Sequence, residues 1–98
     1  MQQPITKQQI EELRQSTTIK LIDIRTPAEY EKMHVPGALN IPAETISENI
    51  TKFSVNDTIV CICNKGQERS QNAVETISAM GFANVFYLKD GTVGWLAE

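Results

Sequence analysis

The sequence has one histidine and two cysteines among its 98 residues, and its net charge of −3 gives it no excess of basic side chains. Nucleic-acid-binding domains usually carry a basic patch or stripe, so we expect no nucleic-acid partner. The longest apolar run, residues 59–63, is far too short to cross a bilayer. Residues 1–4 have neither the basic start nor the apolar stretch of a targeting signal. We therefore expect no association with membranes.

The two cysteines, Cys61 and Cys63, are separated by a single residue. On a strand they would point to the same face, and a disulfide between them would be strained. Unpaired cysteines are typical of a reducing compartment, which favours a cytoplasmic location. A metal site needs three or four ligands, and the one histidine, His34, has only these cysteines as plausible companions. We predict no metal ion and no cofactor.

The composition is that of an ordinary globular domain, with 41% hydrophobic and 21% charged residues. A chain of this length buries roughly two thirds of its unfolded surface, which is enough for one core. The sequence contains no repeat, no low-complexity stretch and no linker. We therefore predict a single domain over residues 1–98.

Helical and strand patterns alternate along the chain. Capping boxes at Thr6 and Thr26 start two helices, the first over residues 7–15 and the second ending before the Pro36-Gly37 turn. Two more helices are expected over residues 44–53 and 70–80, and strands over residues 19–24, 38–41, 58–63 and 85–88. This alternation predicts an α/β fold with a parallel sheet covered on both faces. Ligands of such sheets bind beyond the carboxyl ends of the strands.

The segment after the strand over residues 58–63 has the residue types of an anion site. It runs from Cys63 through Asn64, Lys65, Gly66, Gln67 and Glu68 to Arg69 and Ser70. Successive backbone N–H groups of such a loop can converge on an anion, and the start of the following helix adds further donors. Gly66 permits the backbone angles of a tight curl, and Arg69 supplies a planar fork for oxyanions. We predict residues 64–69 as the substrate-binding residues.

Cys63 faces this loop and is the predicted nucleophile. The pKa of a cysteine, about 8.5 in a model peptide, falls near positive charge or a helix N-terminus. A thiolate beside an anion site suits attack on sulfur or phosphorus in an anionic substrate. The simpler alternative is a buried cysteine without chemistry, because free cysteine is among the most buried residue types. The coincidence of strand, glycine, arginine and helix start favours the catalytic interpretation.

Three further residues are expected to support the loop. Asp23 and Arg25 lie at the end of the strand over residues 19–24, where their hydrogen bonds can brace it, and Ser70 lies at its far end. Lys65 either attracts an anion or is simply solvated. Glu68 is expected to be a surface charge at the helix start, and a role as proton donor is the alternative.

Four segments of the chain, in order, resemble the motifs of the rhodanese-like domain family. Residues 21–30 resemble the first motif, residues 34–42 the second, residues 63–70 the active-site loop and residues 81–95 the closing segment. The resemblance implies a rhodanese-like fold with a central five-stranded parallel sheet flanked by helices on both faces. It also implies a sulfurtransferase that takes sulfane sulfur from a donor such as thiosulfate, holds it as a Cys63 persulfide and passes it to a thiophilic acceptor.

The loop is one residue longer than is usual in small sulfurtransferases of this family, because five residues, 64–68, separate Cys63 from Arg69. This spacing resembles the loops of phosphatases and arsenate reductases built on the same fold, although Ile62 stands where such phosphatases usually have histidine. The leading hypothesis is a sulfurtransferase with a small anionic sulfur donor and, as acceptor, cyanide, a protein thiol or a sulfur carrier. A cysteine-dependent phosphatase or arsenate reductase and a non-catalytic sulfur-relay module are the alternatives.

Overall fold

The computed structural model describes residues 3–97 of the chain. Three residues lie outside the described part of the chain: Met1, Gln2 and Glu98. The ends of the domain predicted over residues 1–98, and the first half of the segment 1–4 that shows no targeting signal, therefore fall outside the described residues. The elements in chain order are β1 (Pro4–Ile5), α1 (Lys7–Leu13), β2 (Ile19–Asp23), α2 (Pro27–Lys32), β3 (Leu39–Asn40), α3 (Ile46–Asn49), β4 (Thr58–Ile62), α4 (Glu68–Ala79), β5 (Asn84–Leu88) and α5 (Gly91–Ala97). Short 3-10 turns, Ala43–Thr45 and Ile50–Lys52, flank α3.

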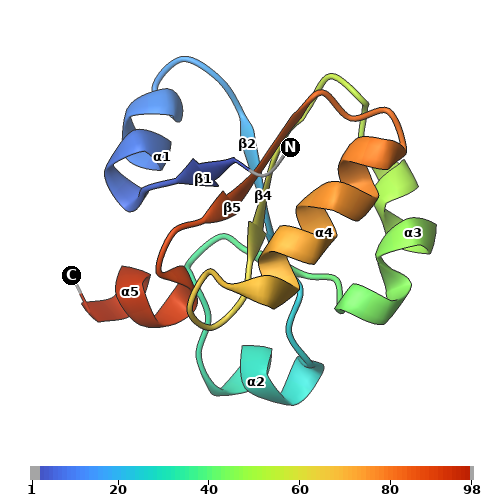
Figure 1. Ribbon diagram of the computed structural model, residues 1–98. Coiled ribbons are helices and arrows are strands. Elements are labelled where there is room, and N and C mark those ends of the chain that lie inside the picture. The colour runs from blue at the N-terminus through green and yellow to red at the C-terminus, as the bar shows by residue number, and fades with distance from the viewer. Residues whose placement is uncertain (1–2, 98) are drawn as a thin grey trace.

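The strands form one sheet in the order β1-β5-β4-β2-β3, and every pair of neighbours is parallel. The expected five-stranded parallel sheet is therefore confirmed. After β2 the chain crosses to β3 at one edge, whereas after β4 it crosses to β5 on the other side. Because the two connections diverge from adjacent strands, they leave a crevice between the carboxyl ends of β2 and β4. Figure 1 shows the segments that follow both strands at the same end of the sheet.

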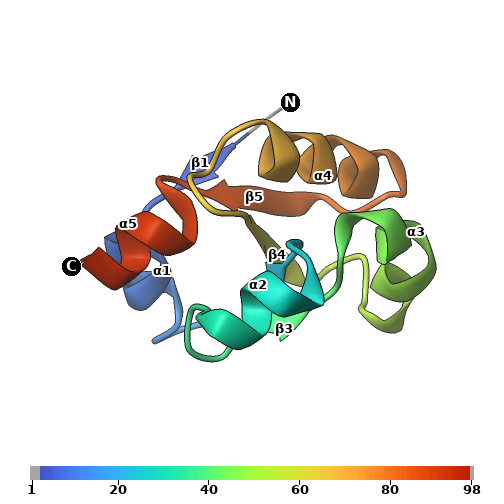
Figure 2. The same cartoon turned by 90° about the horizontal axis from the view of Figure 1, so that it is seen from below.

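Helices cover both faces of the sheet, as expected. Side chains of a strand alternate between the faces, so Ile59 and Cys61 enter one hydrophobic core while Val60 and Ile62 enter the other. Figure 2 shows α3 and α4 over one face and α1, α2 and α5 over the other. Burial on both faces explains why β4 is a continuous apolar run instead of an alternating pattern.

Both predicted capping boxes are present. Thr6 Oγ1 accepts a hydrogen bond from the N–H of Gln9 at 3.1 Å, and Thr6 N–H donates to Gln9 Oε1 at 2.9 Å. Thr26 and Glu29 make the same pair of bonds at 3.3 and 3.1 Å. The helix predicted over 7–15 ends earlier than expected, at Leu13.

Two elements, β1 and α5, were not predicted. β1 is two residues long and becomes a strand only through β5, where Tyr87 and Lys89 N–H donate to the carbonyls of Gln3 and Ile5 at 2.9 Å each. α5 contains two glycines in seven residues, and glycine disfavours helices. Its Trp95 is buried in the core beside α1, so tertiary packing outweighs this local preference.

The helix predicted over 70–80 begins two residues earlier, at Glu68, and ends at Ala79. Gln67 precedes it and makes no side-chain cap, so no capping signal marks this start. As a result Glu68 and Arg69 belong to the first turn of α4 and not to the loop. Within residues 3–97, no helix is both long enough and apolar enough to span a membrane.

A substitution at Ile77 tests the packing of α4 on the sheet, because the Ile77 side chain is completely buried. Replacing it with alanine leaves a cavity, so we expect Ile77→Ala to lower the free energy of unfolding by about 2–5 kcal/mol. Urea denaturation measures the change. The control is Thr76→Ala at the neighbouring exposed position, where a change within about 0.5 kcal/mol is expected. Equal stability of the two variants would contradict this packing.

Candidate active site

Cys63 comes directly after β4, and the start of α5 holds its backbone. Thr92 donates to the Cys63 carbonyl through its N–H at 2.9 Å and its hydroxyl at 3.2 Å, and Val93 N–H donates to the Asn64 carbonyl at 3.0 Å. A Cβ on Gly91 would lie 2.5 Å from both carbonyl oxygens, so only glycine allows this approach. The sequence analysis did not identify Thr92, because nothing local links it to Cys63.

Gly66 forms the predicted tight curl and also packs against the segment after β5. Its φ of +68° agrees with the expected tight curl of the loop. A Cβ at this position would lie 2.4 Å from the Leu88 carbonyl oxygen and 2.7 Å from the Asp90 nitrogen. Gly66 therefore packs against the segment between β5 and α5 and does not line the pocket, although it was predicted among the substrate-binding residues.

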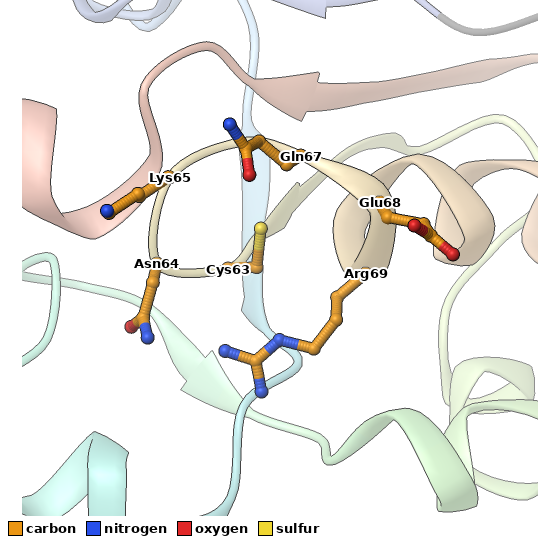
Figure 3. Close-up of a pocket in the computed structure, with 6 residues that line it drawn as sticks. All are labelled: Cys63, Asn64, Lys65, Gln67, Glu68 and Arg69. Atoms are coloured by element: carbon orange, nitrogen blue, oxygen red, sulfur yellow. The ribbon is translucent and has the colours of Figure 1, made fainter.

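The other predicted binding residues surround one pocket of about 270 Å³, which is lined by Cys63, Asn64, Lys65, Gln67, Glu68 and Arg69. Figure 3 shows the Cys63 sulfur pointing into the ring formed by the loop, whereas Lys65 and Glu68 point outward from it. Pockets for drug-sized ligands span about 300–1,000 Å³. The smaller volume here suits a small anion or a sulfur-bearing group.

Two opposing effects act on the ionisation of Cys63. Burial is the largest single effect and raises the pKa of the thiol. Hydrogen bonds from the Ser70 hydroxyl and from the backbone N–H groups of Gln67, Ser70 and Lys65 together outweigh it, so the pKa of Cys63 lies below its ordinary value. The loop therefore places its amides where they stabilise a thiolate.

The Ser70 hydroxyl links this sulfur to the loop. Its oxygen lies 3.2 Å from Cys63 Sγ and 3.1 Å from the Gln67 carbonyl oxygen, and the residue is fully buried. A hydroxyl has one proton, so in the thiol form it donates to Gln67, and in the thiolate form it can rotate to donate to sulfur. The Gln67 carbonyl still accepts from Gln71 N–H at 3.1 Å, so this rotation leaves it paired.

Arg25 joins the ends of β2 and α2 to the loop. Its side chain donates to the Asp23 carboxylate at 2.7–3.2 Å, to the Met33 carbonyl at 2.6 Å and to Asn64 Oδ1 at 3.0 Å. Hydrogen bonding to Asp23 raises the pKa of Arg25 despite burial, so the guanidinium stays charged. Arg25 thus contacts the loop directly, whereas Asp23 reaches it through Arg25.

Arg69 is engaged by Glu29 of α2. Its Nη1 and Nη2 lie 3.4 and 3.5 Å from Glu29 Oε1 and Oε2, and Asn64 Nδ2 donates to Oε2 at 3.2 Å. Figure 3 shows Asn64 and Arg69 extending to the same side of the loop. Hydrogen bonds from Arg69 and then from Thr26 lower the pKa of Glu29 to about 2.

Glu29, like Thr92, contacts the site without having been predicted there. It lies three residues after Thr26, and the capping box by itself explains a carboxylate at this position. A carboxylate has about four lone-pair sites, so capping leaves some of them for other donors. Only the folded chain shows that these donors are Asn64 and Arg69.

Cys61 and His34 lie outside the pocket. Cys61 is completely buried, as predicted, and burial followed by the charge of Cys63 raises its pKa to about 12. Both cysteines are free thiols. The His34 ring stacks on Tyr30 with 3.9 Å between ring centroids. Within residues 3–97, no group of three or more potential metal ligands is found.

The fold agrees with the comparison to known protein families. The family model of the rhodanese-like domain matches residues 6–98. The chain therefore belongs to the rhodanese-like domain family.

Individual relatives show how far this similarity extends. Thiosulfate sulfurtransferase PspE of Escherichia coli is 41% identical over 66 residues, which cover 65% of this chain and 62% of PspE. A candidate sulfur carrier protein of Bacillus subtilis, YrkF, is 32% identical over 81 residues, which cover 83% of this chain and 43% of YrkF. The chain thus spans less than two thirds of the length of both proteins.

A solved structure gives the same fold. The crystal structure of a rhodanese-like domain protein from Staphylococcus aureus matches with a TM-score of 0.83 at 29% sequence identity. The match covers 95% of this chain and 90% of that structure, so the shared fold extends over nearly the whole of both.

Removing the Ser70 hydroxyl tests its part in stabilising the thiolate. Because its hydrogen bond lowers the pKa of Cys63, we expect Ser70→Ala to raise that pKa. The pH profile of iodoacetamide alkylation should shift to higher pH, so that near neutral pH the variant reacts more slowly than the wild type. At a pH where Cys63 is fully ionised in both proteins, the variant should no longer be slower. Cys61 is buried and does not contribute. Ser78→Ala, farther along α4, is the control, and an unshifted profile for Ser70→Ala would contradict this role.

A substitution at Gly66 tests the packing of the loop against the segment after β5. Gly66→Ala adds both backbone strain and a collision, whereas Gly81→Ala adds strain at φ +102° with its nearest neighbour 4.0 Å away. We expect Gly66→Ala to lose about 1–3 kcal/mol more free energy of unfolding than Gly81→Ala in urea denaturation. Equal losses would show that the loop can move away from Leu88.

Proposed function

We propose that this chain acts as one rhodanese-like domain and as a sulfurtransferase that carries sulfane sulfur as a persulfide on Cys63. The observation that supports this most is the position of the Cys63 sulfur. It faces a small pocket, and backbone amides of Lys65, Gln67 and Ser70 lower its pKa. The similarity to PspE, which is named a thiosulfate sulfurtransferase, supports the same class of reaction.

In the first half-reaction the Cys63 thiolate attacks the outer sulfur of a small anionic donor, for which thiosulfate is the proposed example. A bond forms between Cys63 Sγ and the transferred sulfur as the sulfur–sulfur bond of thiosulfate breaks. Sulfite leaves with the electron pair of that bond. Loop amides and Arg69 would hold the sulfite oxygens and stabilise the charge that develops on them.

In the second half-reaction an acceptor nucleophile attacks the outer sulfur of the persulfide. The persulfide bond breaks, and its electron pair returns to Cys63 as a thiolate. The hydrogen bonds that lower the pKa of Cys63 make this thiolate a good leaving group. Cyanide, a protein thiol or a sulfur carrier would serve as acceptor, and the two half-reactions predict ping-pong kinetics.

A phosphatase or arsenate reductase is the second candidate, favoured by the five residues between Cys63 and Arg69. Two observations argue against it. Ile62 is completely buried where such phosphatases usually have histidine, and Glu68 points away from the sulfur. The Glu68 carboxylate is therefore not placed as a proton donor to a leaving group beside Cys63.

Intact-mass spectrometry after mixing with thiosulfate, without reductant, tests the persulfide. We expect the wild type to gain one sulfur atom and to lose it again when cyanide is added, because the thiolate regenerates in the second half-reaction. Cys63→Ser should gain nothing, and Cys61→Ala should behave as the wild type. No adduct on the wild type, or an adduct on Cys63→Ser, would refute the mechanism for thiosulfate.

The same proteins distinguish the alternative functions. Hydrolysis of an aryl phosphate, or thiol-dependent reduction of arsenate, by the wild type but not by Cys63→Ser would favour the second candidate. A sulfur-relay module would instead bind its partner in both proteins and turn over no donor in either.

A further inference from the structure

We propose that Glu29 limits the anion affinity of the pocket by holding Arg69 to one side, so that an oxyanion must compete with Glu29 for the Arg69 guanidinium. This inference rests on the proposed function for the identity of the oxyanion, thiosulfate. Beyond that function, the Glu29 carboxylate would compete with the bound substrate anion for the Arg69 guanidinium.

The geometry around Arg69 is that of an exchangeable contact. The two guanidinium nitrogens face the two Glu29 oxygens at 3.4 and 3.5 Å, which is long for an arginine–carboxylate pair. The side chains of Arg69 and Glu29 are 46% and 33% exposed, so water screens their attraction. Arg69 also lines the pocket, so it lies within reach of both Glu29 and a bound anion.

The hydrogen bonds that Glu29 accepts from other residues are shorter than its contacts with Arg69. Its Oε1 accepts from the N–H and the hydroxyl of Thr26 at 3.1 Å each, and its Oε2 accepts from Asn64 Nδ2 at 3.2 Å. The hydrogen bond from Arg69 is the largest cause of the lowered pKa of Glu29, and the hydrogen bonds from Thr26 also lower it. Because the bonds from Thr26 remain when Arg69 turns away, the carboxylate stays ionised near neutral pH. The negative charge thus stays beside the pocket when Arg69 moves.

Asn64 fixes the position of Glu29 relative to the buried part of the site. Its Oδ1 accepts from Arg25 at 3.0 Å while its Nδ2 donates to Glu29, so the amide can take only one orientation. Asn64 follows Cys63 directly, which ties the carboxylate to the residue next to the nucleophile. Displacement by an anion therefore moves the Arg69 side chain and leaves Glu29 in place.

Removing the charge of Glu29 should consequently strengthen anion binding. Glu29→Gln leaves the helix start intact, because glutamine also serves at this position of a capping box. It frees Arg69 and removes the repulsion between Glu29 and the anion. An exposed ion pair is weak, so we expect the affinity for an oxyanion to rise about two- to fivefold. A merely structural role for Glu29 would give weaker binding instead.

The experiment measures binding without chemistry. Dissociation constants for thiosulfate and for sulfate are determined by NMR titration of backbone amides in Cys63→Ser and Cys63→Ser/Glu29→Gln, at constant ionic strength. Glu31→Gln in the same background is the matched control, because it removes an equal charge from an exposed position of α2. In a Cys63→Ser/Arg69→Gln background, Glu29→Gln should change the dissociation constants much less, because there is no guanidinium to free.

Tighter binding in Glu29→Gln, and not in Glu31→Gln, supports the inference. Unchanged or weaker binding, no binding in either protein, an equal gain in Glu31→Gln, or a full gain without Arg69 would each overturn it. These outcomes do not depend on sulfur transfer. A missing persulfide with a stronger anion affinity would refute the proposed reaction alone, and a persulfide with an unchanged affinity would refute only the role of Glu29.

Discussion

Asp23 and Arg25 form a buried ion pair in the crevice between β2 and β4, and the geometry of the site depends on it. Burying charges is unfavourable unless they are paired and their hydrogen bonds are made. Here Asp23 accepts from the backbone and the side chain of Arg25, and the rest of the guanidinium donates to Met33 and Asn64. Meeting these requirements joins three segments that are distant in sequence, so the loop after Cys63 is positioned by the need to satisfy one buried charge.

The loop, not the strand, lowers the pKa of Cys63. Cys61 and Cys63 contribute to the same hydrophobic core, and both are nearly or completely buried. The pKa of Cys61 rises to about 12, as burial requires, whereas the pKa of Cys63 falls. The difference is the set of donors around Cys63, the Ser70 hydroxyl and the converging amides. Partial exclusion of water strengthens these hydrogen bonds, and together they outweigh the direct effect of burial, which raises the pKa.

Charge at the mouth of the pocket is balanced and not simply positive. Lys65, Glu68 and Arg69 line the pocket together, and Glu29 contacts Arg69. Because α4 begins at Glu68, the five residues between Cys63 and Arg69 consist of four loop residues and one helical residue. The arginine is therefore carried on a helix whose first turn faces α2. The five-residue spacing therefore affects the direction of the Arg69 side chain as well as the width of the loop.

Local patterns in the sequence predicted much of this protein, because they act between near neighbours in the chain. The apolar residues 58–62 make a strand, the boxes at Thr6 and Thr26 start helices, and Cys63 follows a strand as expected. β1 and α5 could not be predicted, since a two-residue strand needs β5 and a glycine-containing helix needs the core around Trp95.

The contact between Glu29 and Arg69 joins residues 40 positions apart, and that between Cys63 and Thr92 joins residues 29 apart. The amino-acid sequence by itself determined where most of the helices and strands form and which residue type stands at the strand end. Tertiary structure alone decided which side chains meet at that end, because strand order brings distant segments together and no local pattern records strand order.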